Sequence, residues 1–320
     1  MGKLVAMTGN TAAYTGAALC RPDLIAAYPI TPQSSVVEGL AGMVYNGKLD
    51  SNFVQVESEH SAMSVVQGAA AAGGRVFTAT SAQGLALMYE PYFRMSTLRI
   101  PMVMALATRE MTSPETIWSG QQDAMSVREA GWIQMFCESN QEILDMMLQA
   151  YMIAEDPRVQ LPVNVCYDGF YSSHLIEGLE VPSQAEADAF LPAYAGKTYL
   201  DPGAPAALDP LTPGDLMLKY RKNHLDAMEA AQAVIEEVDV KFAARFGRSY
   251  GGLIEEYKTE DADVVILTIG GMSGTGKDAV DAAREKGIKA GLVKLRFTRP
   301  FPAKRMAKAL ANCKAFAVID

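Results

Sequence analysis

Two carboxylates, Glu57 and Glu59, stand between an apolar run and an alanine-rich segment that is predicted to be a helix. Acidic side chains at a helix start usually act as caps and interact favourably with the helix dipole. A carboxylate that faces a dry pocket could instead exchange a proton with a bound ring. The small apolar residues after Glu59 favour burial there, and a lone buried carboxylate is costly without a partner. Capping is the more common interpretation, and a functional carboxylate is the alternative.

Two further residues with suitable chemistry follow predicted strands. Thr31 lies in the turn Tyr28-Pro29-Ile30-Thr31-Pro32, and Arg109 comes shortly after the apolar run 101–107. Ligands bind at the carboxyl ends of strands in open parallel sheets. A hydroxyl there can donate to a substrate carboxylate, and a guanidinium can bind it in bidentate fashion. A helix cap at Thr31 and a surface salt bridge at Arg109 explain each residue equally well in isolation.

A third candidate is the glycine-rich segment from Gly271 to Lys277, which almost satisfies the phosphate-loop pattern. Asp278 stands where that pattern needs a hydroxyl for magnesium, and its charge would compete with phosphate at the start of the helix. We therefore expect a glycine loop over 270–276 that lets strand and helix pack closely, followed by a helix over 277–286. A nucleotide-binding regulatory module using this loop is the alternative.

These residues are positioned by strands and helices that alternate along the first half of the chain. Such alternation is typical of βαβ units and of a mostly parallel sheet. The expected strands are 24–28, 52–56, 75–80, 101–107 and 163–167, and the expected helices are 34–44, 59–72, 84–92 and 141–155.

The composition changes near residue 178. Residues 178–215 are rich in proline and are expected to form a long irregular connection, followed by one long half-buried helix over 216–247. A second α/β unit begins near residue 261. Its expected strands are 264–269, 290–295 and 315–319. Three strands make an unusually small α/β domain, so we expect this domain to be incomplete at its C-terminal end.

Composition excludes several classes of function. The 320 residues carry a formal net charge of −9, which argues against a bulk electrostatic grip on nucleic acid. The four cysteines form no CxxC pair and the three histidines no paired motif, so we expect no metal and no iron–sulfur cluster on this chain. No apolar run reaches the roughly 20 residues that span a bilayer. We expect a cytoplasmic protein without a membrane span.

Taken together, the motifs resemble the α subunit of the 2-oxoacid:ferredoxin oxidoreductases, the pyruvate:ferredoxin oxidoreductase family. Segments 167–171 and 190–192 are most similar to the branch that contains the phenylglyoxylate and oxalate oxidoreductases. The matching elements, in the family's order, are Tyr28–Pro32, Glu57–Glu59, Thr80–Leu85, Thr108-Arg109, Gln122-Asp123, Asp168–Phe170 with Ser173-His174, Phe246–Arg248 and Arg299–Pro302.

The resemblance implies an α/β fold with two domains. Residues 1–230, with the connection 178–215 and the bridging helix, are similar to the pyrimidine-binding domain of thiamine diphosphate enzymes. Residues 255–320 are similar to the transketolase C-terminal-like domain. Thiamine diphosphate would be shared with a β subunit that holds the diphosphate, Mg²⁺ and a [4Fe–4S] cluster. Further γ and ferredoxin-like δ subunits, coenzyme A and ferredoxin or another low-potential acceptor are the other partners that the family implies.

The resemblance also assigns roles to residues. Glu59 matches the carboxylate that hydrogen-bonds the aminopyrimidine ring, and Thr31 and Arg109 match the residues that hold the substrate carboxylate. The expected cofactor contacts are Glu59, Pro29, Ile30, Ser81, Gln83 and Gly84. The expected substrate pocket adds Trp118, Gln121, Gln122 and Asp123 to the carboxylate clamp. One departure is Gly120-Gln121, which stands where pyruvate enzymes often carry a histidine, so the pocket is expected to differ from one made for pyruvate.

We therefore expect a subunit of an enzyme that oxidatively decarboxylates a small 2-oxoacid such as pyruvate, phenylglyoxylate or oxalate, passes electrons to iron–sulfur clusters on partner subunits and forms an acyl-CoA. The nucleotide-binding module described above is one alternative. The other is a non-catalytic structural subunit whose partners supply all the chemistry.

Overall fold

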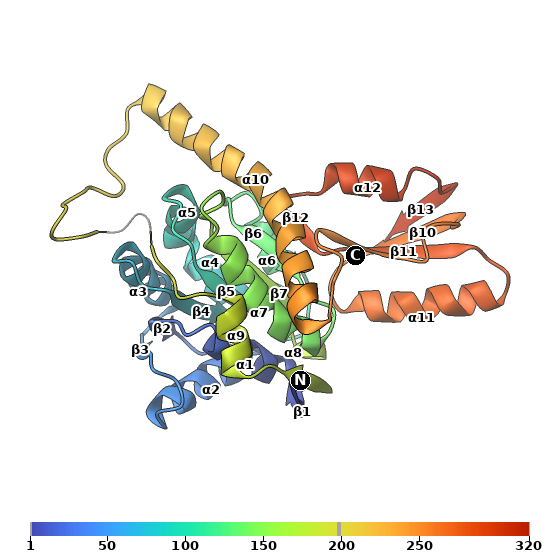
Figure 1. The fold of residues 1–320 in the computed structure, drawn as a ribbon, viewed down its shortest axis with the longest axis horizontal. Coiled ribbons are helices and arrows are strands. Elements are labelled where there is room, and N and C mark those ends of the chain that lie inside the picture. Colours follow the sequence, from blue (N-terminus) through green and yellow to red (C-terminus); the bar gives the residue numbers. More distant parts are fainter. Residues whose placement is uncertain (1, 197–199, 320) are drawn as a thin grey trace.

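The computed structural model describes residues 2–196 and 200–319, and its centre is a seven-stranded sheet (Figure 1). The strand order is β12-β6-β7-β5-β4-β2-β3, and all strands except β12 run parallel. The expected α/β architecture is thus confirmed. The strands are β2 (Leu24–Ala27), β3 (Asn52–Gln55), β4 (Val76–Thr80), β5 (Val103–Thr108), β6 (Ile133–Phe136), β7 (Val163–Asp168) and β12 (Phe297–Arg299).

Helices cover both faces of this sheet, and each face has its own hydrophobic core. One core is formed with α1 (Gly9–Leu19), α2 (Ser34–Tyr45) and α7 (Asn140–Ala154). The opposite core is formed with α3 (Glu59–Ala71), α4 (Ala82–Leu87), α5 (Tyr89–Thr97) and α6 (Gln122–Ser126). Because both faces are covered, the central strands β4 and β5 are buried along their whole length, as expected for a parallel sheet.

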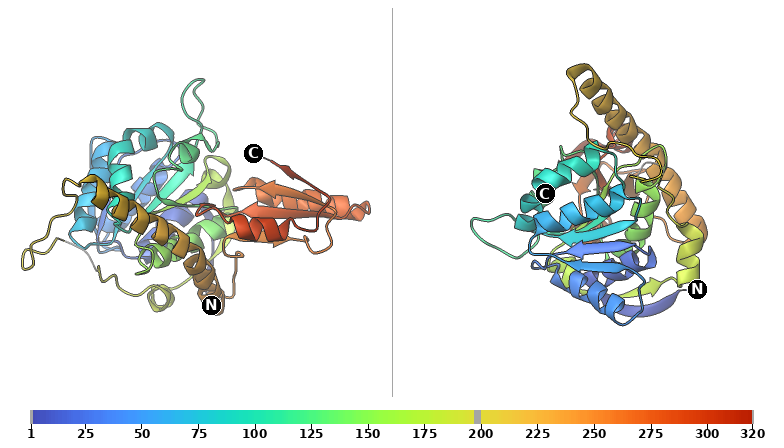
Figure 2. Two further views of the ribbon diagram at one scale, coloured as in Figure 1. Left: turned by 90° about the horizontal axis from the view of Figure 1, so that it is seen from above. Right: turned by 90° about the vertical axis from the view of Figure 1, so that its left-hand side faces the viewer.

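A smaller α/β unit lies beside the first (Figures 1 and 2). Its sheet has the order β13-β10-β11-β9, in which β9 is antiparallel. The strand β9 adds a fourth member to the three strands that the sequence predicts. The elements are β9 (Ile254–Tyr257), β10 (Val264–Thr268), α11 (Met272–Glu285), β11 (Ala290–Leu295), α12 (Ala303–Ala309) and β13 (Ala315–Val318).

The segment 178–215 is only partly irregular, which corrects the prediction. Its first residues belong to β8 (Ile176–Val181), which pairs antiparallel with β1 (Lys3–Thr8), and α9 (Gln184–Phe190) follows. The short helix α8 (Tyr171–His174) precedes this ribbon. Ser183 caps α9 and forms a capping box with Glu186, a local signal that the proline-rich composition obscured.

The long helix α10 (Gly214–Phe246) connects the two units, and its buried residues all lie between Ala227 and Phe242. Its apolar residues from Ala227 to Phe242 pack against the body of the protein, and Gly247 ends it in the left-handed conformation. The N-terminal half projects away from the body (Figure 1). The prediction of one long half-buried helix is confirmed.

Two segments differ from the prediction in their secondary structure. The helix expected over 84–92 is two helices, because the chain breaks at Met88 between α4 and α5. The loop expected over 270–276 is mostly helix, because α11 begins at Met272. Gly276 packs against the sheet, where a Cβ atom would lie 2.6 Å from Leu292 Cδ1. Close packing of helix and strand therefore does explain this glycine.

Two features join the units. The strand β12 follows β11 in sequence but pairs with β6, so residues 297–299 belong to the first sheet. A set of charged side chains, here called the interunit ion network, links α7 and the loop before it to the second unit. Its members are Glu138, Glu142, Lys277, Lys294 and Arg296. Glu142, Lys294 and Arg296 have side chains that are at most 2% exposed.

Candidate active site

Four neighbouring parallel strands of the first sheet carry the predicted site residues just after their carboxyl ends. Thr31 follows β2, Glu59 follows β3, Gly84 follows β4 and Arg109 follows β5. Carboxyl ends of parallel strands meet at one edge of the sheet, which is where open α/β sheets bind ligands. The topology therefore gathers residues that are far apart in the sequence.

Glu59 is the first residue of α3, and it is buried (6% exposed). Ser58 caps the helix by accepting a hydrogen bond from the Ser61 backbone N–H at 3.2 Å. Burial raises the pKa of the Glu59 carboxyl, and a hydrogen bond from its own backbone N–H opposes this only in part. A buried carboxyl with a raised pKa is suited to sharing a proton with a ligand.

The turn after β4 lies directly against Glu59. A Cβ atom at Gly84 would overlap Thr80 Oγ1 and would come within 2.6 Å of Glu59 Oε1. Glycine is therefore required here by close approach to the carboxylate. Ser81 Oγ donates to the Ala107 carbonyl at 2.6 Å. This residue, which was predicted to contact the cofactor, therefore holds the turn against β5.

Gln83 lies in the same turn, and only one end of its side-chain amide has a hydrogen-bond partner. Its Nε2 donates to Thr112 Oγ1, which ties the turn to the loop after β5. Its Oε1 is buried and has no partner among the described residues. An unpaired buried acceptor on the residue before Gly84 is a position where a ligand would supply the missing donor.

Arg109 and Thr31, the two residues expected to hold the substrate carboxylate, are in contact. Arg109 is 5% exposed, and its Nη1 donates to the Thr31 carbonyl at 2.9 Å while its Nε donates to the Thr116 carbonyl at 2.7 Å. Its Nη2 lies 3.7 Å from a carboxylate oxygen of the exposed Glu115. Two carbonyls thus fix the guanidinium, and the weakly engaged Nη2 edge is available to a substrate carboxylate beside the exposed Thr31.

Asp123, which was expected in the substrate pocket, is buried beneath the site and holds two of its segments together. Its carboxylate is fully buried and accepts hydrogen bonds from the backbone N–H groups of Ala82, Arg109 and Ala124 at 2.9, 3.0 and 2.7 Å. Burial raises its pKa to about 7, although these bonds act in the opposite direction. Ala82 has a φ of 40°, an unusual conformation for alanine, so Asp123 holds a strained turn and joins it to Arg109.

The remaining predicted residues surround this centre. Pro29 is exposed and Ile30 partly exposed in the turn that carries Thr31. Gln122 is exposed and accepts from the Met111 backbone N–H at 3.1 Å. Trp118 lies on the loop after β5, and its ring centroid is 5.0 Å from that of Phe170 and 5.6 Å from that of Tyr171. We call these three side chains the aromatic cluster.

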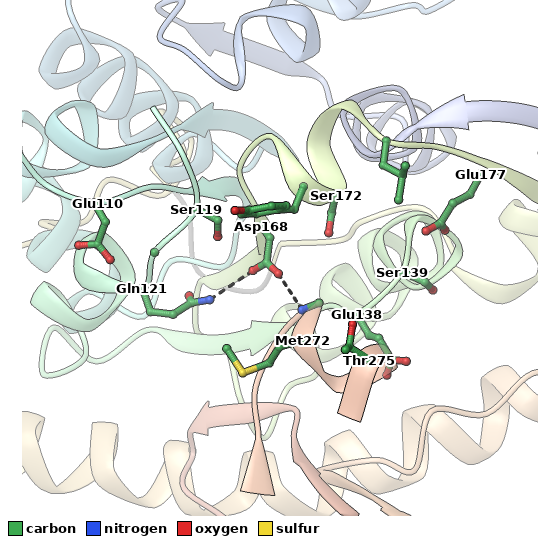
Figure 3. A pocket seen from close by; sticks show the side chains of 15 residues that line it. Glu110, Ser119, Gln121, Glu138, Ser139, Asp168, Ser172, Glu177, Met272 and Thr275 are labelled. Carbon is green, nitrogen blue, oxygen red and sulfur yellow. Dashed lines mark hydrogen bonds between the residues drawn. The ribbon is translucent and has the colours of Figure 1, made fainter. Parts of the chain in front are cut away.

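Gln121 lies apart from the carboxylate clamp, at a cavity between the two units (Figure 3). Its Nε2 donates to Asp168 Oδ1 at 3.3 Å, and the Gly271 backbone N–H donates to Asp168 Oδ2 at 2.8 Å. Burial raises the pKa of Asp168. The cavity measures about 690 Å³, and its walls include Glu110, Glu138 and Glu177. The glycine segment thus packs against the end of β7 through Asp168.

Two residues of the site were not singled out as site residues by the sequence analysis. Thr80 has its hydroxyl buried beside Glu59, and Asp168 joins the two units. Each is the last residue of a parallel strand, β4 and β7 respectively. Their position at the end of a strand is the sequence signal that could have identified them as site residues. For Asp168 this signal was missed, because the expected strand 163–167 ended one residue before it.

Within residues 2–196 and 200–319, no group of three or more His, Cys, Asp and Glu side chains could hold a metal ion. Over the same ranges, none of the helices combines the length and the apolar character needed to cross a membrane.

Comparison with known protein families identifies the chain's relatives. Residues 15–240 match the family described as "Pyruvate flavodoxin/ferredoxin oxidoreductase, thiamine diP-bdg". Residues 262–320 match "Pyruvate:ferredoxin oxidoreductase core domain II". This chain belongs to the pyruvate:ferredoxin oxidoreductase family. The resemblance that the sequence motifs indicated is thereby confirmed.

Named members of the family are similar over nearly the whole chain. The α subunit of NADH-dependent phenylglyoxylate dehydrogenase from Aromatoleum evansii is 48% identical over 99% of this chain and 78% of its own length. The pyruvate synthase subunit PorA from Methanothermobacter thermautotrophicus is 44% identical over 99% of this chain and 82% of its own length. Like these relatives, the chain is a 2-oxoacid oxidoreductase subunit, and the enzyme class expected from the sequence is confirmed.

Solved structures support the fold. The 2-oxoglutarate:ferredoxin oxidoreductase from Magnetococcus marinus superposes with a TM-score of 0.80 at 20% identity, over 99% of this chain. This chain spans 58% of that longer chain. A split-gene transketolase superposes with a TM-score of 0.51 at 12% identity. At these identities the likeness concerns the fold alone.

Proposed function

We propose that this chain is the α subunit of a thiamine diphosphate-dependent enzyme that oxidatively decarboxylates a small 2-oxoacid. The observation that carries the proposal is the buried Glu59 carboxylate, which lies against Gly84 at the same sheet edge as the Arg109–Thr31 pair. A proton-sharing carboxyl and a carboxylate clamp are the two elements that such a reaction needs from this chain.

The residues beside Glu59 fit the aminopyrimidine ring of thiamine diphosphate. Such a ring presents nitrogen acceptors and an amino donor, and the described site offers a carboxyl of raised pKa together with the unpaired Gln83 Oε1 and Thr80 Oγ1. When bound, the cofactor supplies the electron sink for loss of carbon dioxide. Glu59 would hold a proton at the ring nitrogen, and the turn 81–84 would contact the ring with Pro29 and Ile30.

The clamp would bind and orient the acid. Arg109 is held by two backbone carbonyls, so it can present Nη2 without a large loss of side-chain entropy. The Thr31 hydroxyl would donate to the same carboxylate. Asp123 keeps Arg109 and the turn at Ala82 in register through its backbone hydrogen bonds. The chain's part is therefore to position the acid against the ring and to supply one proton site.

For the substrate, we propose an aromatic 2-oxoacid of the phenylglyoxylate type ahead of pyruvate or an oxalate-like acid. The loop that carries Trp118 of the aromatic cluster is held to Arg109 through the Thr116 carbonyl, and Trp118 in turn contacts Phe170 and Tyr171. Such side chains favour a flat apolar substituent on the acid. Trp118 and Tyr171 are 52% and 62% exposed, so their faces are available to a ligand.

The rest of the machinery is assigned to partners. We propose that a β subunit holds the diphosphate, Mg²⁺ and a [4Fe–4S] cluster, with γ and ferredoxin-like δ subunits and a ferredoxin-type acceptor completing the complex. Coenzyme A is the proposed acyl acceptor. The structure with which this chain shares its fold contains bound coenzyme A. All four cysteines here are free thiols, as in reducing compartments, and the cytoplasm is the compartment that we propose.

We also propose the division into domains that the family implies, with residues 1–230 as the pyrimidine-binding domain and residues 255–320 as the transketolase C-terminal-like domain. The separate sheets support this division. The strand β12 is the exception, since it belongs to the first sheet.

The geometry argues against a nucleotide-binding module at Gly271–Lys277. Gly274 and Gly276 lie within α11, so the segment forms no open phosphate loop. Lys277 Nζ lies 2.8 Å from a Glu138 oxygen and 2.7 Å from a Glu255 oxygen, and the Gly271 backbone N–H is taken by Asp168. Groups that would bind phosphate are thus occupied by carboxylates.

The proposal is tested with Glu59→Gln in the anaerobically purified complex. Viologen reduction is followed with pyruvate, phenylglyoxylate, oxalate, 2-oxoglutarate and indolepyruvate, with and without coenzyme A. Loss of a positioned acid–base group lowers turnover by roughly a hundredfold or more. Glu57→Gln is the matched control, since Glu57 is exposed and hydrogen-bonded to Ser61. Wild-type turnover of the Glu59 variant would support the remaining alternative, a non-catalytic structural subunit.

A further inference from the structure

Thr80, the last residue of β4, has a buried hydroxyl without a partner. The residue is 0% exposed, and its Oγ1 makes no hydrogen bond to any described residue. A buried hydroxyl that is left unpaired destabilises a protein, because the hydrogen bonds it made to water in the unfolded chain are not replaced. Valine has the same shape without this cost. The threonine therefore calls for an explanation that lies outside the stability of the unloaded chain.

A second threonine on the same strand shows how such a residue is normally satisfied. Thr78 is also 0% exposed and lies on the same face of the strand, two residues earlier. Its Oγ1 donates to the Ala26 carbonyl at 2.7 Å. Thr78 thus stabilises the sheet in an ordinary way, and Thr80 does not.

The environment of Thr80 Oγ1 indicates its partner. Both Thr80 Oγ1 and Glu59 Oε1 crowd the same side of Gly84, at the position where a side chain would begin. The Glu59 carboxylate has a hydrogen bond from its own backbone N–H, and a carboxylate accepts several such bonds. The two oxygens thus approach the same point beside Gly84, but Thr80 Oγ1 makes no hydrogen bond in the chain alone.

We propose that the Thr80 hydroxyl donates a hydrogen bond to the Glu59 carboxylate when the cofactor ring is seated, and so directs the other carboxylate oxygen toward the ring. Thr80 is then a positioning residue that acts through Glu59. A β-branched side chain suits this role, because its χ1 angle is restricted and the hydroxyl direction is set in advance. The inference rests on the proposed function and adds a residue to its cofactor site.

The experiment compares Thr80→Val, Thr80→Ser and Thr78→Val in the complex depleted of cofactor. Thiamine diphosphate with Mg²⁺ is titrated into each complex by calorimetry, and the melting temperature of each is measured without cofactor. For Thr80→Val we expect the Kd to rise about tenfold, the effect of losing one hydrogen bond to a charged group. Thr80→Ser keeps the hydroxyl, and its Kd should stay within about twofold of the wild type.

Stability is expected to follow the opposite pattern. Thr80→Val removes an unpaired hydroxyl, so its melting temperature should equal or exceed that of the wild type. Thr78→Val loses a satisfied hydrogen bond, so it should melt at a lower temperature and bind cofactor with the wild-type Kd.

Two results would overturn the inference. One is a wild-type Kd in Thr80→Val. The other is an equal loss of affinity in Thr80→Ser, which would mean that the site needs the methyl group and not the hydroxyl. Failure of the proposed function is seen separately, in unchanged turnover of Glu59→Gln. If Glu59→Gln is inactive while Thr80→Val binds normally, Thr80 alone is excluded.

Discussion

Replacing Glu142 with glutamine removes the central charge of the interunit ion network. Glu142 Oε2 lies 2.6 Å from Lys294 Nζ, and its Oε1 lies 2.9 Å from Arg296 Nε. Removing one partner of a buried pair costs about 3–5 kcal/mol, because the other charge is left uncompensated. Lys294 retains Glu138 at 3.0 Å, whereas Arg296 has no other carboxylate within 4 Å among the described residues. We therefore expect the lower end of this range.

The pKa of Glu142 gives a second value for the free energy by which this carboxylate stabilises the folded chain. Burial alone raises the pKa of this carboxyl, but the charges of Lys294 and Arg296 outweigh burial and hold it at about 2, against an ordinary value of 4.5. Each pKa unit corresponds to about 1.4 kcal/mol, so the shift is worth about 3 kcal/mol. Because the pKa is lower in the folded state, this stabilisation is complete above pH 4.5 and is lost as the pH falls toward 2.

The assay is thermal unfolding of the complex, with the transition of this chain followed at pH 7. A loss of about 3 kcal/mol predicts a melting temperature lower by roughly 5–10 °C in Glu142→Gln. The matched control is Glu138→Gln. Its two lysine partners keep other carboxylates, Lys277 with Glu255 at 2.7 Å and Lys294 with Glu142. This control should lower the melting temperature by no more than about 3 °C.

The acid series gives the refuting result. The difference in stability between wild type and Glu142→Gln should persist down to about pH 4.5 and disappear toward pH 2. A Glu142 variant that melts with the wild type, or no lower than the Glu138 control, would show that the network does not stabilise the contact between the units.

Two further predictions concern the candidate active site. Arg109→Ala should raise the KM for the 2-oxoacid at least tenfold with a smaller change in kcat, because the clamp acts on the substrate carboxylate, and steady-state kinetics measure this; an unchanged KM would contradict the clamp. Gly84→Ala should lower turnover and destabilise the chain by about 1–3 kcal/mol, because its methyl group would displace Glu59; normal turnover and melting would contradict the close approach.

Much of the first sheet could be predicted from the sequence because its signals are local. Runs such as 76–80 and 103–108 are apolar along their whole length, as expected for strands that are buried on both faces. Loops that follow parallel strands meet at one edge, so Thr31 and Arg109 could be placed at one edge of the sheet by topology, whereas Glu59 and Gly84 were assigned through the family resemblance. The hydrogen bond from Arg109 to the Thr31 carbonyl shows that the first two residues do lie together.

The features that the sequence did not predict depend on distant partners. Asp123 was expected to line the substrate pocket, but it is buried, and its carboxylate accepts hydrogen bonds from the backbone N–H groups of Ala82 and Arg109 on two other segments and of the adjacent Ala124. The segment 270–276 was expected to be a glycine loop, and glycine is indeed unfavourable in helices. Packing of Gly276 against Leu292 outweighs that local preference. The residues near these positions in the sequence carry no signal for such contacts.

The pairings within the interunit ion network could not be predicted from the sequence either. Lys294 and Arg296 lie in and beside a strand of the second unit, and their carboxylate partners come from the region of α7 more than 150 positions earlier. A charged residue in an apolar strand signals that a partner exists. It does not say which residue the partner is, since the pairing arises when the two units dock.

The pairing of β12 with β6 has a consequence for folding during synthesis on the ribosome. All four residues of β6 are buried in the finished sheet. Until residues 297–299 have been synthesised, β6 is an open edge, and such edges pair readily with other chains. At 5–20 residues per second, the interval after β6 is made lasts roughly ten to thirty seconds. The nascent first unit therefore depends on shielding of this edge, by chaperones or by its neighbours, before its own last strand arrives.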